Sequence, residues 1–290
     1  MLKALLGLGT ALDETKTVDF TPEGEVSRLQ VKVHSGDVTV RHWDQPHVQA
    51  DVHVRVRGDE NKPMEAYWNL RQVGTEVQFE QAPLHNWIFG PHVCVDVVLY
   101  VPEAITKGNL KSSNGFLEVE GFNGAINAHT SNGGIRVVDV EGDVHAHTHN
   151  GHVEISQIDG AVDATSHNGI LDVGKVTSNV KAHTHNGQIH LQDCGAIVNI
   201  STHNGKIKIH QTVPLQGAWS VETSNGGIDL FVPSNTDATY NLHTSAGRIT
   251  GSAIPVKTSG FSQHLSVTTG QGTHPVHIRT SAGGIVINHN

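Results

Sequence analysis

Histidine recurs at a fixed interval in the second half of the chain. His149, His167, His185 and His203 each follow Thr or Ser, precede Asn-Gly, and stand 18 residues from the next. Neutral imidazole is a ligand for Zn, Cu and Ni, and histidine changes its charge between about pH 5 and 8. The spacing therefore leaves three alternatives open: a metal-collecting wall, an acid-sensitive surface, or an inert ladder of like side chains.

Two more histidines lie two residues earlier in the same pattern. The candidate metal ligands are thus His147, His149, His167, His183, His185 and His203. A closed zinc site normally has three or four ligands of fixed geometry, often with Cys or carboxylate among them. Nearby acidic residues are few, and Cys194 falls in an inward-facing column. We therefore expect no resident cofactor, and Zn, Ni or Cu binding along the ladder is kept as an alternative.

The elements that position these histidines are short repeated strands. Thr/Ser-Ser/His-Asn-Gly begins at residues 112, 130, 148, 166, 184 and 202 and again at 223, with Thr-Ser-Ala-Gly at 244 and 280. In residues 144–149, Val, Ala and Thr alternate with three histidines, so the apolar side chains share one face of a strand. Stacking such units puts positions 18 residues apart about 4.8 Å from each other. This predicts an all-β fold, a single-chain β-solenoid of about 18-residue coils.

An asparagine occupies the corner of each unit. Asn tolerates left-handed backbone geometry, and stacked amides can hydrogen-bond from coil to coil. We expect structural turn roles for Asn114, Asn132, Asn150, Asn168, Asn186, Asn204 and Asn225.

The pattern divides the chain into three segments. Residues 1–16 are expected to be a lead-in, because the apolar run at the start has no cleavage site after it. Residues 17–108 alternate without the 18-residue period and are predicted to be a β-rich N-terminal cap of irregular coils; residues 109–290 are predicted to be the regular solenoid. The last residues keep the strand rhythm with no recognisable cap, which predicts an open C-terminal strand that could template self-association.

Composition disfavours several function classes. The formal net charge of −9 with neutral histidines disfavours nucleic-acid binding, although protonation of the 22 histidines would reverse its sign. No stretch is long and apolar enough for a membrane span, and two cysteines are too few for a disulfide scaffold. Acidic residues are scattered, and no phosphate-cradling loop, nucleophile elbow or His-Glu-x-x-His motif occurs. We therefore expect no enzymatic activity.

Three motifs carry a resemblance to a known family. They are Gly-Asp-Val-Thr-Val-Arg-His-Trp-Asp at 36–44, Val-Asp-Val-Val-Leu-Tyr-Val-Pro at 95–102, and the repeated Asn-Gly-x-Ile/Leu-x-Val. Over about residues 25 to 290 the chain resembles the bacterial putative-adhesin family of β-strand-repeat domains of unknown function. The resemblance implies a cell-envelope or extracellular location. The residues show no convincing signal or anchor and favour a cytoplasmic or peripheral one.

These observations predict a non-enzymatic, adhesin-like interaction module. Its repetitive His/Asn-rich face would contact an unidentified protein or glycan. Two alternatives stay open: a self-associating structural scaffold that uses the uncapped C-terminal strand, and divalent-metal binding along the histidine ladder.

Overall fold

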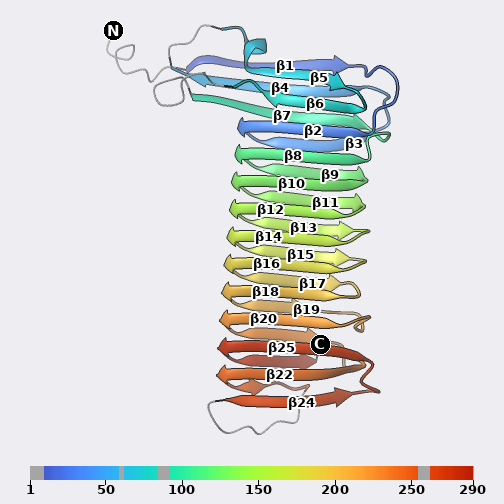
Figure 1. Cartoon of the computed structure of the whole chain (residues 1–290), viewed down its shortest axis with the longest axis vertical. Coiled ribbons are helices and arrows are strands. Elements are labelled where there is room, and N and C mark those ends of the chain that lie inside the picture. The colour runs from blue at the N-terminus through green and yellow to red at the C-terminus, as the bar shows by residue number, and fades with distance from the viewer. Residues whose placement is uncertain (1–9, 59–61, 84–91, 254–261, 290) are drawn as a thin grey trace. The chain divides into compact units, whose positions relative to one another are not determined.

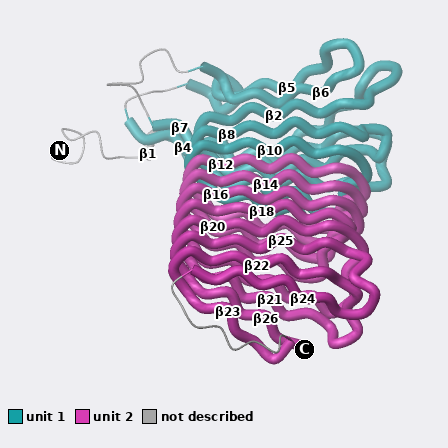
Figure 2. The backbone as a smooth tube through the Cα atoms, turned by 60° about the horizontal axis from the view of Figure 1, so that its bottom comes forward, with its two compact units in different colours: residues 1–137 teal, residues 138–290 magenta. Residues whose placement is uncertain are grey.

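The fold consists of strands joined by tight corners. The computed structural model describes residues 10–58, 62–83, 92–253 and 262–289. Within these residues every regular element is a strand except one 3-10 turn at Met64–Tyr67, and no helix is long and apolar enough to cross a bilayer (Figure 1). The chain divides into two compact units, residues 1–137 (unit 1) and 138–290 (unit 2) (Figure 2). The boundary lies inside β11 (Ile135–Glu141).

In unit 2 the chain alternates between two sheets. Sheet B contains β12 (Val144–Asn150), β14 (Val162–Asn168), β16 (Val180–Asn186), β18 (Val198–Asn204) and β20 (Trp219–Asn225). Sheet A contains β13 (Val153–Ile158), β15 (Leu171–Val176), β17 (Ile189–Cys194), β19 (Ile207–His210) and β21 (Ile228–Val232). Up to β20 and β21, each of these strands pairs in parallel with its equivalent one coil later, mostly 18 residues on. The predicted solenoid is confirmed.

Alternation along each strand fills the interior. In β12, Val144, Ala146 and Thr148 are buried while the three histidines between and beside them are exposed. The inward column at the second bend of each coil, Val140, Ile158, Val176 and Cys194, is also buried. Each fully buried aliphatic side chain contributes about 1.5–3 kcal/mol relative to exposure, so the inward columns hold the coils together.

Four successive coils make their second bend without glycine, whereas the coil before them has Gly121 at the equivalent position. Asp139, Gln157, Lys175 and Asp193 have φ values of 58°, 59°, 53° and 48°, in the left-handed region. Each stands immediately before a residue of the inward column, and the ladder of sheet A skips it: Gly174 pairs with Gln192, and Val176 with Cys194. The left-handed residue therefore bulges the strand and lets the next side chain point inward again.

Unit 1 contains coils of the same kind. The coil of β2 (Arg28–Ser35) and β3 (Val38–Trp43) pairs in parallel with β8 (Lys107–Asn114) and β9 (Leu117–Asn123), and β10 (Ala125–Asn132) pairs with β8. The strands β6 (Glu76–Gln81) and β7 (His92–Pro102) form a coil on the opposite side of β2 and β3. Part of the predicted irregular cap is thus solenoid without the 18-residue period.

Antiparallel strands complete unit 1. β1 (Thr10–Phe20) pairs with β4 (Val48–Arg57), β4 pairs with β7, and β5 (Trp68–Val73) pairs with β6. β1 begins inside the segment that was expected to be a lead-in. Its sequence is largely polar, so the apolar alternation that indicates a strand is weak there, and it forms an edge strand paired with β4. Residues 1–9 of that segment lie outside the described residues.

The end of unit 2 corrects one prediction. The last coil, β25 (His274–Ala282) and β26 (Ile285–His289), lies between the coil of β20 and β21 and the coil of β22 (Ala238–Ala246) and β23 (Ile249–Thr250). The expected open C-terminal strand is wrong: β26 is paired on both sides, and Ile285 and Ile287 are fully buried. The strand at the edge of sheet B is instead β24 (Gln263–Thr269), antiparallel to β22.

The left-handed bend gives a stability prediction. Replacing Lys175 by glycine relieves the steric cost of its backbone conformation, so we expect Lys175→Gly to raise the free energy of unfolding by about 0.5–1 kcal/mol. Lys208→Gly, in β19, is the matched control and should lower it by about 0.5–1 kcal/mol, because its φ is not positive. Urea denaturation measures both; a loss of stability in Lys175→Gly would contradict the assignment.

Candidate functional site

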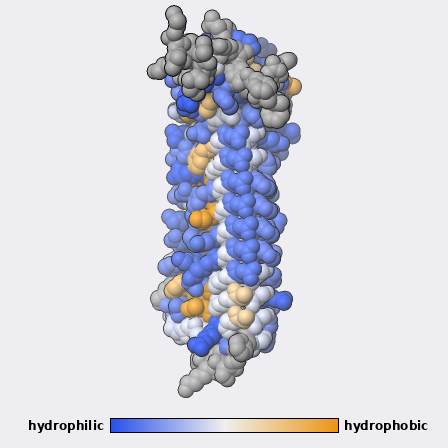
Figure 3. Space-filling view, turned by 90° about the vertical axis from the view of Figure 1, so that its left-hand side faces the viewer, coloured by the Kyte–Doolittle hydropathy of each residue, from blue (hydrophilic) through white to orange (hydrophobic). Residues whose placement is uncertain are grey.

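Four histidines form a stacked ladder at the ends of the sheet B strands. The ring centroids of His149 and His167 are 4.8 Å apart with planes at 3°, and those of His167 and His185 are 5.0 Å apart at 7°. His185 and His203 are 5.0 Å apart at 3°. All four are exposed, and Figure 3, which looks onto these strand ends, shows hydrophilic side chains aligned in a column. We call these four residues the histidine ladder.

The stacked geometry does not suit chelation. Zn–N bonds are about 2.0–2.1 Å, so one ion can bridge two nitrogens no more than about 4.2 Å apart. Like rings displaced by one strand repeat hold their equivalent nitrogens at about the stacking distance, 4.8–5.0 Å here. In the described part of the chain, no group of three or more His, Cys, Asp or Glu is arranged to hold a metal. Metal binding along the ladder stays a prediction, and it requires rings to rotate out of the stack.

The other two candidate ligands, His147 and His183, are not adjacent to each other in sheet B. Thr165 lies between His147 and His183 in the register of sheet B. Nδ1 of His183 forms a 2.8 Å hydrogen bond with the hydroxyl of Ser201, one strand further on. The six predicted ligands thus divide into a continuous stack of four and two separated side chains.

The corner asparagines form a ladder of amide hydrogen bonds. In unit 2, each Nδ2 donates to Oδ1 of the preceding coil: Asn168 to Asn150 at 2.9 Å, Asn186 to Asn168 at 2.9 Å, Asn204 to Asn186 at 2.8 Å and Asn225 to Asn204 at 2.8 Å. In unit 1, Asn132 donates to Asn114 at 3.0 Å. These amides are exposed but engaged with one another, which gives them an architectural role.

An Asp-His cluster lies on the outer face of sheet A. Oδ1 of Asp172 lies 2.7 Å from Nδ1 of His190, and Oδ2 lies 3.1 Å from Nε2 of His152. His190 also contacts Oε1 of Gln188 through Nε2, at 3.2 Å. Asp172 and His190 are 18 residues apart and adjacent in register, so the 18-residue repeat could have predicted this contact between unlike residues.

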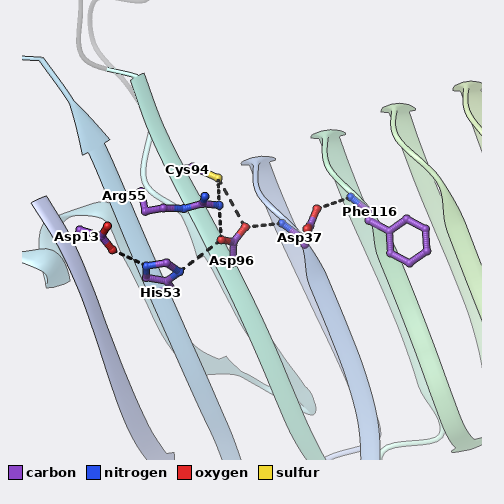
Figure 4. A network of polar contacts seen from close by, with 7 residues as sticks. All are labelled: Asp13, Asp37, His53, Arg55, Cys94, Asp96 and Phe116. Carbon is purple, nitrogen blue, oxygen red and sulfur yellow. Dashed lines mark hydrogen bonds and ion pairs between the residues drawn. The ribbon is translucent and has the colours of Figure 1, made fainter. Parts of the chain in front are cut away.

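A second polar network lies in unit 1, around Asp96 (Figure 4). Nη2 of Arg55 is 2.6 Å from Oδ2 of Asp96, and the neighbouring carboxylate raises the pKa of Arg55. His53 lies between Asp96, at 3.6 Å, and Asp13, at 2.7 Å. The backbone amide of Asp37 donates to Asp96 at 2.9 Å. These contacts connect β1, β4, β7 and the start of β3, and surface pairs of this kind are worth about 0–1 kcal/mol each.

The thiol in this network is not an activated nucleophile. Sγ of Cys94 lies 3.3 Å from Arg55 Nη2 and 3.6 Å from Asp96 Oδ1. Burial, followed by the Asp96 charge, raises the pKa of Cys94. The thiol therefore stays protonated near neutral pH, and thiols react as thiolates.

One histidine of unit 1 is held neutral. Nε2 of His42 donates to the carbonyl of Ile105 at 2.9 Å, while Nδ1 accepts from the amide of Asn123 at 3.1 Å. The ring packs on Phe122 with centroids 4.1 Å apart. Burial lowers the pKa of His42, because it disfavours the charged form. Sequence reasoning missed this residue, which lies outside the repeat.

The chain is similar to one described protein family and to several solved structures. The family model described as Toastrack DUF4097 matches residues 26–288. A putative adhesin from Parabacteroides distasonis ATCC 8503 is similar, with 13% identity, a TM-score of 0.43, and coverage of 95% of this chain and 97% of that chain. A putative adhesin from Bacteroides fragilis NCTC 9343 has 11% identity, a TM-score of 0.39, and coverage of 94% and 97%. A putative lipid binding protein from Parabacteroides distasonis ATCC 8503 has 12% identity, a TM-score of 0.39, and coverage of 96% of each. No curated protein matched.

The two ladders should differ in their effect on stability. Asn186→Ala removes two amide bonds of the ladder, so we expect the free energy of unfolding to fall by about 1–2 kcal/mol. His185→Ser, one residue away, places an exposed Ser where other coils already have one and should change it by less than about 0.5 kcal/mol. Urea denaturation compares the pair; equal losses would show that the ring stack is as structural as the amides.

His42 predicts how stability depends on pH. Because its pKa is lowered in the folded state, its stabilising contribution is complete above its ordinary value of 6.5 and is lost as pH falls below it. Unfolding then takes up as much as about one proton at this site. We expect urea denaturation between pH 8 and 5 to show a shallower acid loss in His42→Gln than in the wild type. A wild-type slope in His42→Gln would refute the assignment.

Proposed function

The chain belongs to the Toastrack DUF4097 family, and we propose that it is a non-enzymatic, adhesin-like binding module that presents its His/Asn-rich face to an unidentified protein or glycan. The observation that carries this proposal is the histidine ladder: four like rings, exposed and held in register at 4.8–5.0 Å. An envelope or extracellular location, where such a partner would lie, belongs to the same proposal.

Order in the ladder supports binding in two ways. Exposed side chains normally lose about 0.5–1.5 kcal/mol each in conformational freedom when a partner immobilises them. Rings that already stack on parallel strands have given up part of that freedom before the partner arrives. A neutral imidazole also offers one donor and one acceptor, so a row of them can meet a repeating polar partner in register.

The thiols support a non-catalytic role. Burial raises the pKa of Cys194 to about 12, and its Sγ faces the carbonyls of Val173 and Gln192. Cys94 is likewise kept protonated beside Arg55 and Asp96. Among the described residues, neither thiol has a histidine hydrogen-bonded to it, which a Cys-His nucleophile requires.

Binding to immobilised cell-envelope fractions tests the proposal. The ladder variant changes His149, His167, His185 and His203 to Ser; its control changes four surface histidines outside the ladder, His34, His92, His264 and His274, to Ser. We expect wild type and control to bind alike at pH 7 and the ladder variant to lose at least about tenfold in affinity, or about 1.4 kcal/mol. Undiminished binding by the ladder variant would refute a role for this face. Calorimetry with Zn²⁺ or Ni²⁺ on the same three proteins tests metal binding.

A further inference from the structure

A groove crosses the outer face of sheet A in unit 2. It has a volume of about 470 Å³ and extends over β13, β15, β17, β19 and β21. Ligand sites in proteins have volumes of about 300–1,000 Å³ and combine an apolar surface with a few placed polar groups. This groove lies on the opposite sheet from the strands that carry the histidine ladder, so an inference about it stands independently of the proposed function.

Gly174 opens the middle of the groove. It pairs with Ser156 on one side and Gln192 on the other, so the coils before and after it have side chains at this position. Its φ is not in the left-handed region, and an added Cβ would make only ordinary contacts, 3.4 Å from the carbonyl oxygen of Gln192 and 3.6 Å from its Cβ. Neither backbone nor packing therefore requires glycine here. A glycine inside a strand weakens the strand and often marks a place where a ligand approaches the backbone.

Polar side chains border the opening. Asp172 lies two residues before Gly174 in β15, on the same outward face of the strand. Its carboxylate oxygens lie 2.7 Å from a ring nitrogen of His190 and 3.1 Å from one of His152. The exposed amide of Gln192 lies along the same groove, and Lys208 follows His190 in the register. Together these groups supply carboxylate acceptors, an amide that both donates and accepts, and an ammonium donor.

An aromatic pair lies at one end. Phe231 of β21 is only partly buried, and its ring centroid is 6.0 Å from that of His210, with the planes at 38°. A phenyl ring that remains partly exposed on a sheet face offers an apolar surface on which a flat ligand can stack.

The hydrogen bonds of the backbone and the charges of the lining exclude some classes of ligand. The amides and carbonyls of β13 to β21 are engaged in the ladders of sheet A, so a peptide cannot join this face by strand addition. Recognition must come from side chains. The lining has two carboxylates, those of Glu154 and Asp172, against one ammonium, that of Lys208, and this balance disfavours an anionic ligand such as a phosphate headgroup. A sugar ring fits, because it has an apolar C–H face and a rim of uncharged hydroxyls that need both donors and acceptors.

We propose that the groove opened by Gly174 binds a neutral oligosaccharide. Its sugar rings lie across the strands of sheet A; Asp172, His190 and Gln192 hydrogen-bond the hydroxyls, and Phe231 stacks on a terminal ring.

The decisive variant fills the groove without harming the fold. Gly174→Val introduces a β-branched side chain that suits a strand and finds room for its Cβ, so its melting temperature should equal or exceed that of the wild type. Phe231→Ala removes the stacking ring. Thr165→Val is the matched control, because it places the same valine on the outer face of sheet B.

The first step is a glycan array that carries neutral hexasaccharides of glucose, mannose, galactose and N-acetylglucosamine, together with uronate-containing and sialylated glycans. The neutral hexasaccharide that the wild type binds best on this array is the probe. Calorimetry then measures the best hexasaccharide. Wild type, Thr165→Val and the ladder variant should bind alike, while Gly174→Val and Phe231→Ala should each lose at least about tenfold in affinity.

Four results would overturn the proposal: no neutral hexasaccharide bound at millimolar concentration, undiminished binding by folded Gly174→Val, undiminished binding by folded Phe231→Ala, or binding only to acidic glycans or to vesicles of anionic phospholipid. Loss of hexasaccharide binding in the ladder variant alone would assign glycan recognition to the histidine face. The failure of the groove is thus distinguishable from the failure of the proposed function.

Discussion

The close approach of successive coils at the Asn-Gly corner is the constraint on which the repeat of unit 2 depends. A Cβ on Gly187 would lie 1.7 Å from the carbonyl oxygen of Gly169, so only glycine permits this stacking distance. The buried hydroxyl of Thr184 donates to the same carbonyl at 3.3 Å, and the amide of Gly187 donates to Asn204 at 3.0 Å. Because the corner fixes the register, the asparagine amides and the histidine rings beside it must stack.

Periodicity revealed what is local to a coil and missed what depends on distant pairing. The 18-residue repeat predicted the inward parity, the Thr and Asn columns and the histidine ladder, because each follows from strand alternation and corner geometry. It could not give the stacking order, since β26 inserts between β21 and β23 through pairings that no interval encodes. The left-handed residues were also hidden, because Lys175 and its equivalents are not the Gly or Asn that usually signal positive φ. The cluster on Asp172 escaped because its members differ in type.

Each unit manages the end of its sheets by departing from sequential stacking. In unit 1, β6 and β7 stack beyond β2 and β3, although they come later in the chain, and antiparallel β1, β4 and β5 follow. In unit 2, β25 and β26 are enclosed between earlier coils, and antiparallel β24 forms the edge of sheet B. An exposed edge strand is a template for another chain whether its own partner is parallel or antiparallel. In unit 2 the edges of the two sheets are β24 and β23, while β26 is paired on both sides, which removes the basis for self-association through the C-terminal strand.

Repetition and recognition make opposite demands on the solenoid surface. A column of identical side chains, such as the histidine ladder, offers the same contacts at every step and cannot distinguish one position along a ligand from the next. A specific site must arise where a column changes its residue type. The outward column of sheet A does so at each step, from Ser156 through Gly174 and Gln192 to His210 and Phe231. The inward columns beside it stay apolar, so this variation is not a consequence of packing. Selectivity for a ligand is therefore expected on the outer face of sheet A, where the backbone repeats from coil to coil but the outward side chains change.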